Sequence, residues 1–120
     1  MKILIAEDDE LILKIIEFRL KKDGHEVIVA KDGREALLKI EELLPDMVIS
    51  DIMMPYTSGL EIVSALKTKL EKKIPVIILS SMGQEDVVLE AFKLGADDFI
   101  TKPFSPNELS MRINRLAAMR

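Results

Sequence analysis

The chain has 120 residues, a length that suits one domain and leaves little room for a second. The absence of cysteine excludes disulfides, iron–sulfur clusters and thiolate zinc sites, and the single histidine, His25, argues against a Ser-His-Asp triad. A net charge of −4 argues against nonspecific nucleic-acid binding, and no apolar run is long enough for a membrane span or a signal peptide. We therefore expect a cytoplasmic globular domain that binds neither membrane nor nucleic acid by itself.

Five short apolar segments predict the strands of a sheet. They are residues 3–6, 26–30, 47–50, 76–80 and 98–101. The first, third and fourth segments lack the alternation of polar and apolar residues that is typical of a strand with one solvent-exposed face. Strands of this kind are covered by helices on both sides and occur in parallel sheets, so the pattern predicts a parallel sheet.

The segments between these strands have helical periodicity. The predicted helices cover residues 10–23, 32–44, 58–70, 84–94 and 105–120. Their ends carry ordinary signals: Asp32 and Ser105 are N-cap residues with a glutamate three positions later, Pro106 suits a first helical position, and Gly24 and Gly95 are stop signals. The apolar stripe predicted to face the core consists of Ile12, Ile15, Ile16 and Leu20 in the first helix, and of Ala36, Leu37, Ile40 and Leu44 in the second.

Five strand–helix pairs predict a doubly wound α/β fold, in which a five-stranded parallel sheet carries helices on both faces. In such a sheet the functional residues lie just beyond the carboxyl ends of the strands. The residues that follow the predicted strands there are Glu7, Asp8, Asp9, Asp51, Ser80 and Lys102.

These side chains suit phosphoryl transfer with a metal ion. Carboxylates that share one edge repel each other unless a cation or protons relieve the charge, and an all-oxygen donor set favours Mg²⁺ over Ca²⁺. The ammonium of Lys102 and the hydroxyl of Ser80 could stabilise phosphoryl oxygens. Asp51 stands apart from the acidic run, which makes it the candidate nucleophile for an aspartyl phosphate.

Each of these residues also has a purely structural explanation. Asp51 could be a turn former or a helix cap after its strand, and Asp9 and Glu10 are favourable acids at a helix start. Ser80 could bond to backbone at a strand end, and Lys102 could be a solvated loop residue. The convergence of separate strand ends on one edge favours the chemical interpretation.

Four segments of the sequence resemble the receiver domain of bacterial two-component response regulators. They are residues 3–10 (I-L-I-A-E-D-D-E), 51–55 (D-I-M-M-P), 75–81 (P-V-I-I-L-S-S) and 95–104 (G-A-D-D-F-I-T-K-P-F). The resemblance implies the flavodoxin-like (βα)5 fold with strand order 2-1-3-4-5, as in the chemotaxis regulators. It also implies a phosphoacceptor domain that promotes only its own phosphoryl transfer and dephosphorylation, with a sensor histidine kinase or phosphotransfer protein as partner.

The resemblance assigns roles to the residues at the carboxyl edge. Asp51 would be the phosphoacceptor, and Mg²⁺ would be held by Asp8, Asp51 and the backbone carbonyl of Met53, with Glu7 acting mostly through water. A shift of one residue along the acidic run would exchange these roles with Asp9.

The same resemblance assigns the switch. Ser80 would be the switching hydroxyl and Lys102 the phosphate-contacting ammonium, which a cis Lys102–Pro103 peptide helps to aim. Phe99 stands where the family often has tyrosine, so the ring can turn inward but cannot donate a hydrogen bond.

The signal would leave through the face of the fourth helix, fifth strand and last helix. Its charged residues are Glu90, Lys93, Asp97, Asp98, Arg112 and Arg115. They form either a solvated surface or a homodimer interface with ion pairs between the chains, as in the winged-helix transcription-factor regulators that residues 102–109 and 112–116 resemble. Residues 1–120 would then be the N-terminal receiver domain of a longer regulator.

Two alternatives remain open. The first is a flavodoxin-like binder of FMN or a nucleotide, against which stand the lack of a glycine-rich phosphate loop and the scarcity of aromatic residues. The second is a phosphorylation-silent pseudo-receiver that acts only as an interaction module.

Overall fold

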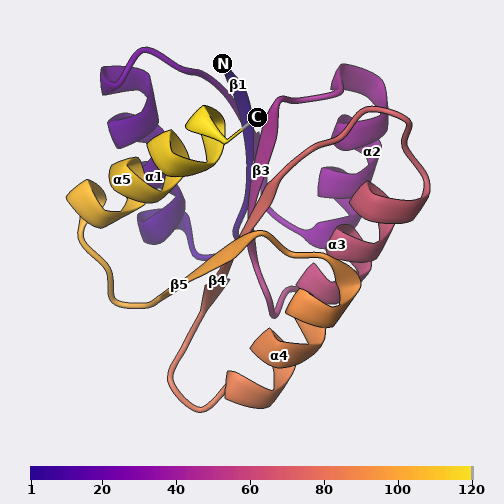
Figure 1. The fold of residues 1–120 in the computed structure, drawn as a ribbon. Coiled ribbons are helices and arrows are strands. Elements are labelled where there is room, and N and C mark those ends of the chain that lie inside the picture. Colours follow the sequence, from indigo (N-terminus) through magenta and orange to yellow (C-terminus); the bar gives the residue numbers. More distant parts are fainter. Residues whose placement is uncertain (120) are drawn as a thin grey trace.

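Strands and helices alternate along the chain in the computed structural model, which describes residues 1–119 (Figure 1). The strands are β1 (Lys2–Ala6), β2 (Glu26–Ala30), β3 (Met47–Asp51), β4 (Val76–Ser80) and β5 (Asp98–Thr101). The helices are α1 (Glu10–Lys22), α2 (Gly33–Leu43), α3 (Gly59–Thr68), α4 (Glu85–Leu94) and α5 (Pro106–Ala118). All five predicted strands and all five predicted helices are therefore present, with ends that differ by a few residues.

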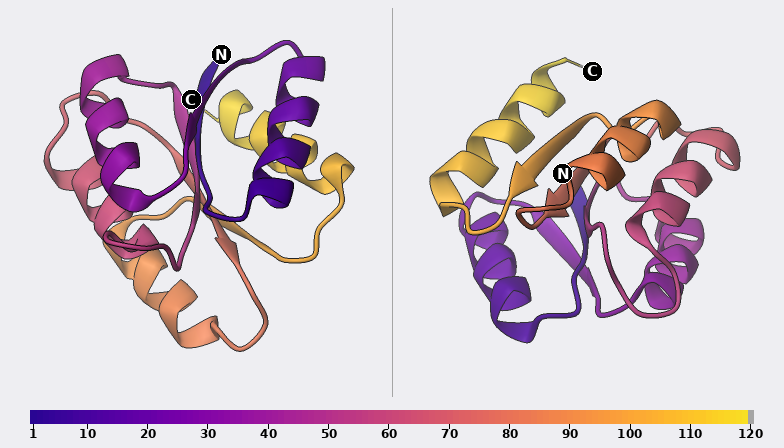
Figure 2. Two further views of the ribbon diagram at one scale, coloured as in Figure 1. Left: turned by 180° about the vertical axis from the view of Figure 1, so that it is seen from behind. Right: turned by 90° about the horizontal axis from the view of Figure 1, so that it is seen from below.

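The strands form one parallel sheet in the order β2-β1-β3-β4-β5, which confirms the predicted doubly wound fold. Helices α1 and α5 cover one face of the sheet, and α2, α3 and α4 cover the other (Figures 1 and 2). Because every strand runs in the same direction, the carboxyl ends of β1, β3, β4 and β5 meet at one edge.

The core has two halves, one on each face of the sheet. Alternate residues of a strand point to opposite faces. In β1, Ile3 and Ile5 therefore pack with α1 and α5, whereas Leu4 and Ala6 pack with α2, α3 and α4. The buried positions of β3 and β4 extend these two layers across the sheet, which explains why the central strands are apolar throughout.

Side-chain caps fix where the helices begin. Asp9 accepts hydrogen bonds from the backbone N–H groups of Leu11 and Ile12, and Asp32 accepts one from Glu35. Ser105 does the same for Glu108, with Pro106 in the first turn. Each cap stabilises its helix by about 1 kcal/mol.

Two expectations about the helices are wrong in detail, and a third falls on a residue that the structure does not describe. Ile15 is 45% exposed, because the stripe of α1 that meets the sheet is centred on Leu13, Ile16 and Leu20. Leu44 is 41% exposed, because α2 ends at Leu43 and the left-handed backbone of the next residue turns the side chain outward. The last helix ends at Ala118, and the predicted end at residue 120 lies outside the described residues.

Between residues 1 and 119 no helix combines the length and the apolar character that a membrane crossing requires.

Candidate functional site

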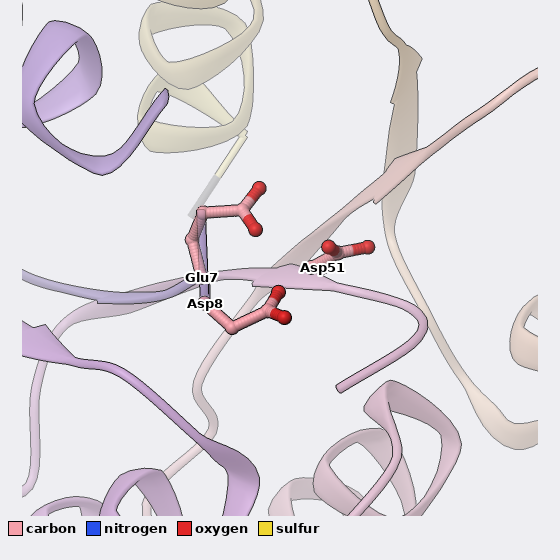
Figure 3. Close-up of side chains that lie close together, drawn as sticks. All are labelled: Glu7, Asp8 and Asp51. Carbon is pink, nitrogen blue, oxygen red and sulfur yellow. The ribbon is translucent and has the colours of Figure 1, made fainter. Parts of the chain in front are cut away.

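The acidic residues predicted from the sequence meet at the carboxyl edge of the two central strands. The pairing of Ala6 with Ser50 sets β1 and β3 in register, so Glu7 follows β1 at the level of Asp51. Figure 3 shows the side chains of Glu7, Asp8 and Asp51 gathered there. One carboxylate oxygen from each lies within 4.8 Å of the others.

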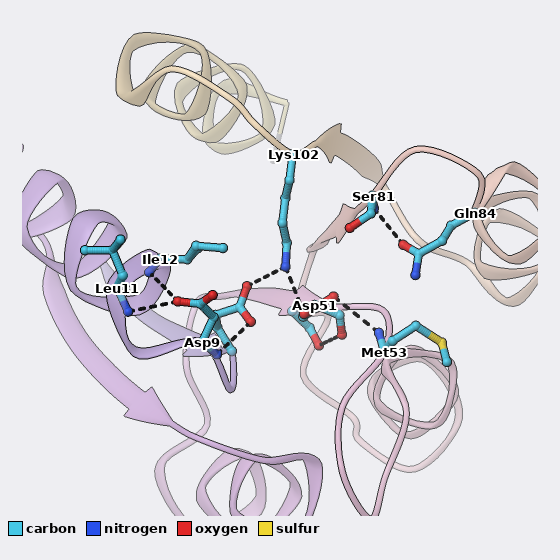
Figure 4. A network of polar contacts seen from close by, with 10 residues as sticks. Asp9, Leu11, Ile12, Asp51, Met53, Ser81, Gln84 and Lys102 are labelled. Atoms are coloured by element: carbon cyan, nitrogen blue, oxygen red, sulfur yellow. Dashed lines mark hydrogen bonds and ion pairs between the residues drawn. The ribbon is translucent and has the colours of Figure 1, made fainter.

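These three carboxylates differ in their exposure to solvent. Glu7 is completely buried, Asp51 is 7% exposed, and Asp8 is exposed. A buried carboxylate needs a charged or hydrogen-bonding partner. Lys102 supplies it to both, because its Nζ lies 2.8 Å from Glu7 Oε1 and 2.9 Å from Asp51 Oδ2 (Figure 4).

The end of β5 positions this lysine. The backbone N–H of Lys102 donates to the carbonyl of Ser80 at 2.7 Å, which fixes the chain after β5 against the end of β4. The Lys102–Pro103 peptide is cis, as the family resemblance implied.

Burial and charge shift the proton equilibria of this group. Burial raises the pKa of Glu7 to about 7, with the charge of Asp51 adding to the effect and Lys102 opposing it. Burial alone would lower the pKa of Lys102, but its contacts with Glu7 and Asp51 outweigh this and raise it. The lysine is therefore a firmly protonated cation, while Glu7 takes up a proton near neutral pH.

Asp9 differs from Glu7 and Asp8 in its contacts. Its side chain caps α1, and its backbone N–H donates to Glu7 Oε2 at 3.2 Å. Glu7, Asp8 and Asp51 form the three-carboxylate group, and Asp9 stands beside it.

The donor set fits a hard divalent cation. Three carboxylates face one ammonium, so negative charge remains uncompensated at the edge of the sheet. Among residues 1–119, the buried Glu7 Oε1 has the ammonium of Lys102, 2.8 Å away, as its only polar partner. Carboxylate oxygens that are already grouped in this way can hold a metal ion.

The predicted switch residues lie on the neighbouring strands β4 and β5. Ser80 ends β4 and is 2% exposed, and Phe99 in the neighbouring β5 is 37% exposed. Both line a cavity of about 300 Å³ between β4, β5 and α4. The ring of Phe99 packs edge-on against Phe92 of α4, with 5.8 Å between the ring centres.

Four of the six charged residues of the predicted output face, namely Asp97, Asp98, Arg112 and Arg115, form ion pairs within the chain. Asp98 is only 5% exposed and forms two ion pairs with α5. Arg112 Nη1 lies 2.8 Å from Asp98 Oδ1, and Arg115 Nη2 lies 2.9 Å from Asp98 Oδ2. Asp97 pairs with Lys67 of α3 at 2.9 Å. The expectation of a freely solvated surface is therefore wrong for Asp98, and the structure does not test pairing between chains.

Two contacts near the site were not predicted. The guanidinium of Arg34 stacks on the ring of Tyr56, and the side-chain oxygen of Gln84 accepts from the backbone N–H of Ser81 at 2.6 Å (Figure 4 draws the second). Residues 34 and 56 are far apart in the sequence, and no local pattern signals that they meet.

Comparisons with known proteins give the same picture. The model of the response regulator receiver domain family matches residues 3–114. The alkaline phosphatase synthesis transcriptional regulatory protein PhoP of Bacillus subtilis is 36% identical over 96% of this chain and 48% of its own length. The response regulator RR06 of Streptococcus pneumoniae is 43% identical over 97% of this chain and 52% of its own length. The chain thus spans about half the length of these curated relatives.

Solved structures agree over almost the whole chain. A response regulator from Chloroflexus aurantiacus superposes with a TM-score of 0.90 at 31% identity, covering 98% of this chain and 97% of that one. The receiver domain of Francisella response regulator 1452 has a TM-score of 0.86 at 39% identity, covering 96% and 94%. With its fold, the acidic edge and the family match in agreement, this chain belongs to the response regulator receiver domain family.

Proposed function

We propose that Asp51 is the phosphoacceptor of a two-component signalling switch and that its donor is a sensor histidine kinase or a phosphotransfer protein. The observation that carries this proposal is the position of Asp51. Its carboxylate lies beside Glu7 and Asp8 at the carboxyl edge of the sheet, with Lys102 Nζ 2.9 Å from Oδ2.

The transfer would be an in-line displacement at phosphorus. A carboxylate oxygen of Asp51 forms the new bond to phosphorus, the bond to the donor's histidine nitrogen breaks, and its electron pair stays on that nitrogen. Lys102 already contacts Asp51 and can pass from the carboxylate to a phosphoryl oxygen without a large movement. The hydroxyl of Ser80, at the end of the adjacent strand, supplies a second donor.

Mg²⁺ is the cofactor that fits this site best. The ligands would be Asp8, Asp51 and the backbone carbonyl of Met53, with Glu7 acting mostly through water. When bound, the ion would supply positive charge that offsets the carboxylates and the incoming phosphoryl oxygens. The support is the all-oxygen set of three grouped carboxylates.

The switch would act through Ser80 and Phe99. Phosphorylation draws the Ser80 hydroxyl toward the acceptor, and Phe99 turns into the space that Ser80 leaves. The two residues line the same cavity, so a movement of one changes the packing of the other. The face of α4, β5 and α5 is repacked, and a homodimer through this face would be the output.

The donor protein would dock beside α1. Leu11, Ile15 and Phe18 are apolar and exposed on this helix. A hollow of about 290 Å³ lies between α1 and the chain after β5, and Lys102 lines it together with Ile12, Ile15 and Phe104. This apolar surface extends to Lys102, which contacts Asp51. It therefore suits a partner that must bring its phosphohistidine to Asp51.

Residues 1–120 would form the receiver domain of a longer transcription regulator, as the names and the greater length of the relatives suggest. The location would be cytoplasmic. Any catalytic activity would be limited to the domain's own phosphoryl transfer and dephosphorylation.

Binding of beryllofluoride, a mimic of the phosphoryl group, tests the proposal. With Mg²⁺, fluorine NMR should show one bound species per chain in the wild type and in the control Glu10→Gln, and none in Asp51→Asn. A wild type that takes up no beryllofluoride would favour the pseudo-receiver, and a flavin absorbance band in the purified protein would favour the cofactor binder.

A further inference from the structure

The loop between β3 and α3, residues 52–58, contains a strained turn. Tyr56 has φ of +69°, in the left-handed region that is unfavourable for a large side chain. The backbone N–H of Thr57 donates to the carbonyl of Pro55 at 2.8 Å and closes a three-residue γ-turn around Tyr56. The γ-turn with positive φ is the rare and strained form, and such strain persists only where the surroundings hold it.

Two contacts with the start of α2 hold this turn. Gly33 lies so close to Thr57 that a Cβ on Gly33 would stand 2.0 Å from the Thr57 carbonyl oxygen. The guanidinium carbon of Arg34 lies 4.2 Å from the centre of the Tyr56 ring, which is a cation–π contact. Tyr56 is 74% exposed, so the arginine rather than burial fixes its ring.

Arg34 is a positive charge at a position where a helix favours negative charge. It lies in the first turn of α2, where the helix dipole disfavours a positive charge. The dipole of α2 disfavours Arg34 and the left-handed backbone disfavours Tyr56, yet the two side chains contact each other. Because local preferences explain neither residue, the contact points to a role in positioning the loop rather than in local stability.

The other end of the loop is also fixed. Ile52 is fully buried, and its backbone N–H donates to Leu79 at 3.0 Å. The N–H of Gly59 donates to the Ile52 carbonyl at 2.9 Å, and a Cβ on Gly59 would stand 2.7 Å from the Asp51 carbonyl oxygen. The backbone of Met53 therefore lies between one firm attachment at Ile52 and a second at the γ-turn.

We infer that Arg34 and Tyr56 are positioning residues for the metal site. Their stack holds the strained turn, and the turn holds the backbone of Met53 where its carbonyl can meet a cation beside Asp8 and Asp51. Loss of the stack lowers the affinity for Mg²⁺ by allowing the loop to relax. This inference rests on the proposed function, in which Met53 provides a ligand.

The test compares Mg²⁺ affinity with stability in the same variants. Calorimetric Mg²⁺ titration and urea unfolding in EDTA are measured for the wild type, Arg34→Ala, Tyr56→Gly and Tyr56→Phe, with Lys31→Ala as a control for loss of a nearby surface cation. Tyr56 is the only tyrosine and the chain has no tryptophan, so wild-type fluorescence reports on this ring alone. The emission should change in Arg34→Ala and stay unchanged in Lys31→Ala.

The expected results separate positioning from plain structural support. Arg34→Ala keeps the strained tyrosine and loses the stack, so its Mg²⁺ affinity should fall about two- to fivefold, the worth of an exposed cation–π contact, with little change in its unfolding midpoint. Tyr56→Gly removes the strain together with the ring, so the turn no longer needs the stack, and this variant should keep nearly the wild-type affinity with an unchanged or higher unfolding midpoint. Tyr56→Phe should keep the wild-type affinity because a phenyl ring also stacks.

Two outcomes would overturn the inference. Equal Mg²⁺ affinity in the wild type and Arg34→Ala would remove the stack from the metal site and leave the proposed function standing. An affinity loss in Arg34→Ala that is matched by an equal loss of unfolding free energy would assign the stack a structural role. A wild type that binds no Mg²⁺ would overturn the proposed function itself, and the inference with it.

Discussion

Lys102 forms ion pairs with two buried carboxylates, Glu7 and Asp51. This shared ammonium explains how the two carboxylates can be buried together when no ligand is bound. Its ammonium stands 2.8 Å from Glu7 and 2.9 Å from Asp51. The carboxylates on the inner side are buried, whereas Asp8 is exposed to solvent. A ligand can therefore approach from the side of Asp8 while Lys102 holds the inner pair.

Removal of this ammonium should destabilise the protein when no metal is present. We expect Lys102→Ala to lose about 2–4 kcal/mol of unfolding free energy in EDTA at pH 8, because two buried carboxylates are left without a cation. Mg²⁺ should restore part of the loss, since it brings positive charge to the same carboxylates. Urea unfolding with and without Mg²⁺ measures both effects.

Lys31→Ala is the matched control. The pair of Lys31 with Glu10 is 3.4 Å long and exposed, so its loss should change stability by less than about 0.5 kcal/mol. Equal losses in the two variants would show that the contacts of Lys102 do not stabilise the fold.

The raised pKa of Glu7 predicts a dependence of stability on pH. The folded pKa of about 7 lies above the ordinary value of 4.5, so folding binds a proton between these values. The stabilisation is complete below about pH 4.5 and is lost as the pH rises through 7, a decline on the order of 3 kcal/mol. Glu7→Gln, compared with the wild type in EDTA, should remove this part of the decline, and parallel pH profiles would contradict the assignment.

At the scale of the elements, α1 has two distinct faces. Leu13, Ile16 and Leu20 pack against the sheet, while Leu11 and Phe18 stand in solvent at 70% and 72% exposure. Large apolar side chains grouped on a helix next to Lys102 are typical of a surface that a partner covers.

A charge on this face should slow transfer from a protein donor only. Ile15→Glu should reduce phosphorylation by the cognate kinase about tenfold, the effect of losing one apolar contact at the centre of an interface. Labelling by acetyl phosphate, which needs no docking surface, should stay at the wild-type rate. Leu38→Glu on α2, 63% exposed on the opposite side of the sheet, is the control and should affect neither reaction. Equal slowing with both donors would place the defect in the site rather than in docking.

The sequence was informative wherever local chemistry determines structure. Apolar strands and helix caps such as Asp9 and Ser105 were predictable because each depends on a few neighbouring residues. The inward position of Ile15 was a wrong prediction, because periodicity identifies a stripe but not its centre.

Contacts between distant segments were harder to predict. The stack of Arg34 on Tyr56 depends on a left-handed tyrosine, which no propensity favours. The burial of Asp98 depends on two arginines that arrive from α5. The carboxylate group was predictable because a parallel sheet brings its strand ends together, although the role of each residue stays a prediction.

At the scale of the whole molecule, the sheet connects the proposed acceptor, Asp51, to the face of α4, β5 and α5. The end of β4 carries Ser80 next to the acidic edge, and the neighbouring β5 carries Phe99 on the outside. The same strand begins with Asp98, which holds Arg112 and Arg115 of α5. Under the proposed function, a rearrangement at Asp51 would therefore reach the face of α4, β5 and α5 through one strand.

This connection predicts a change of oligomeric state. Mg²⁺ with beryllofluoride should shift the protein from monomer toward dimer in sedimentation velocity. Replacement of both Arg112 and Arg115 by alanine should reduce the dimer while beryllofluoride still binds, because the acceptor site is unchanged. Dimerisation of that double variant at the wild-type level would exclude these arginines from the interface.

The most direct test of the central claim is the intact mass of the protein before and after acetyl phosphate with Mg²⁺, with the modified residue located by peptide mapping. We expect a gain of one phosphoryl group per chain on Asp51, no gain in Asp51→Asn and none in EDTA. Undiminished labelling of Asp51→Asn, or a phosphoryl group on another residue, would contradict it.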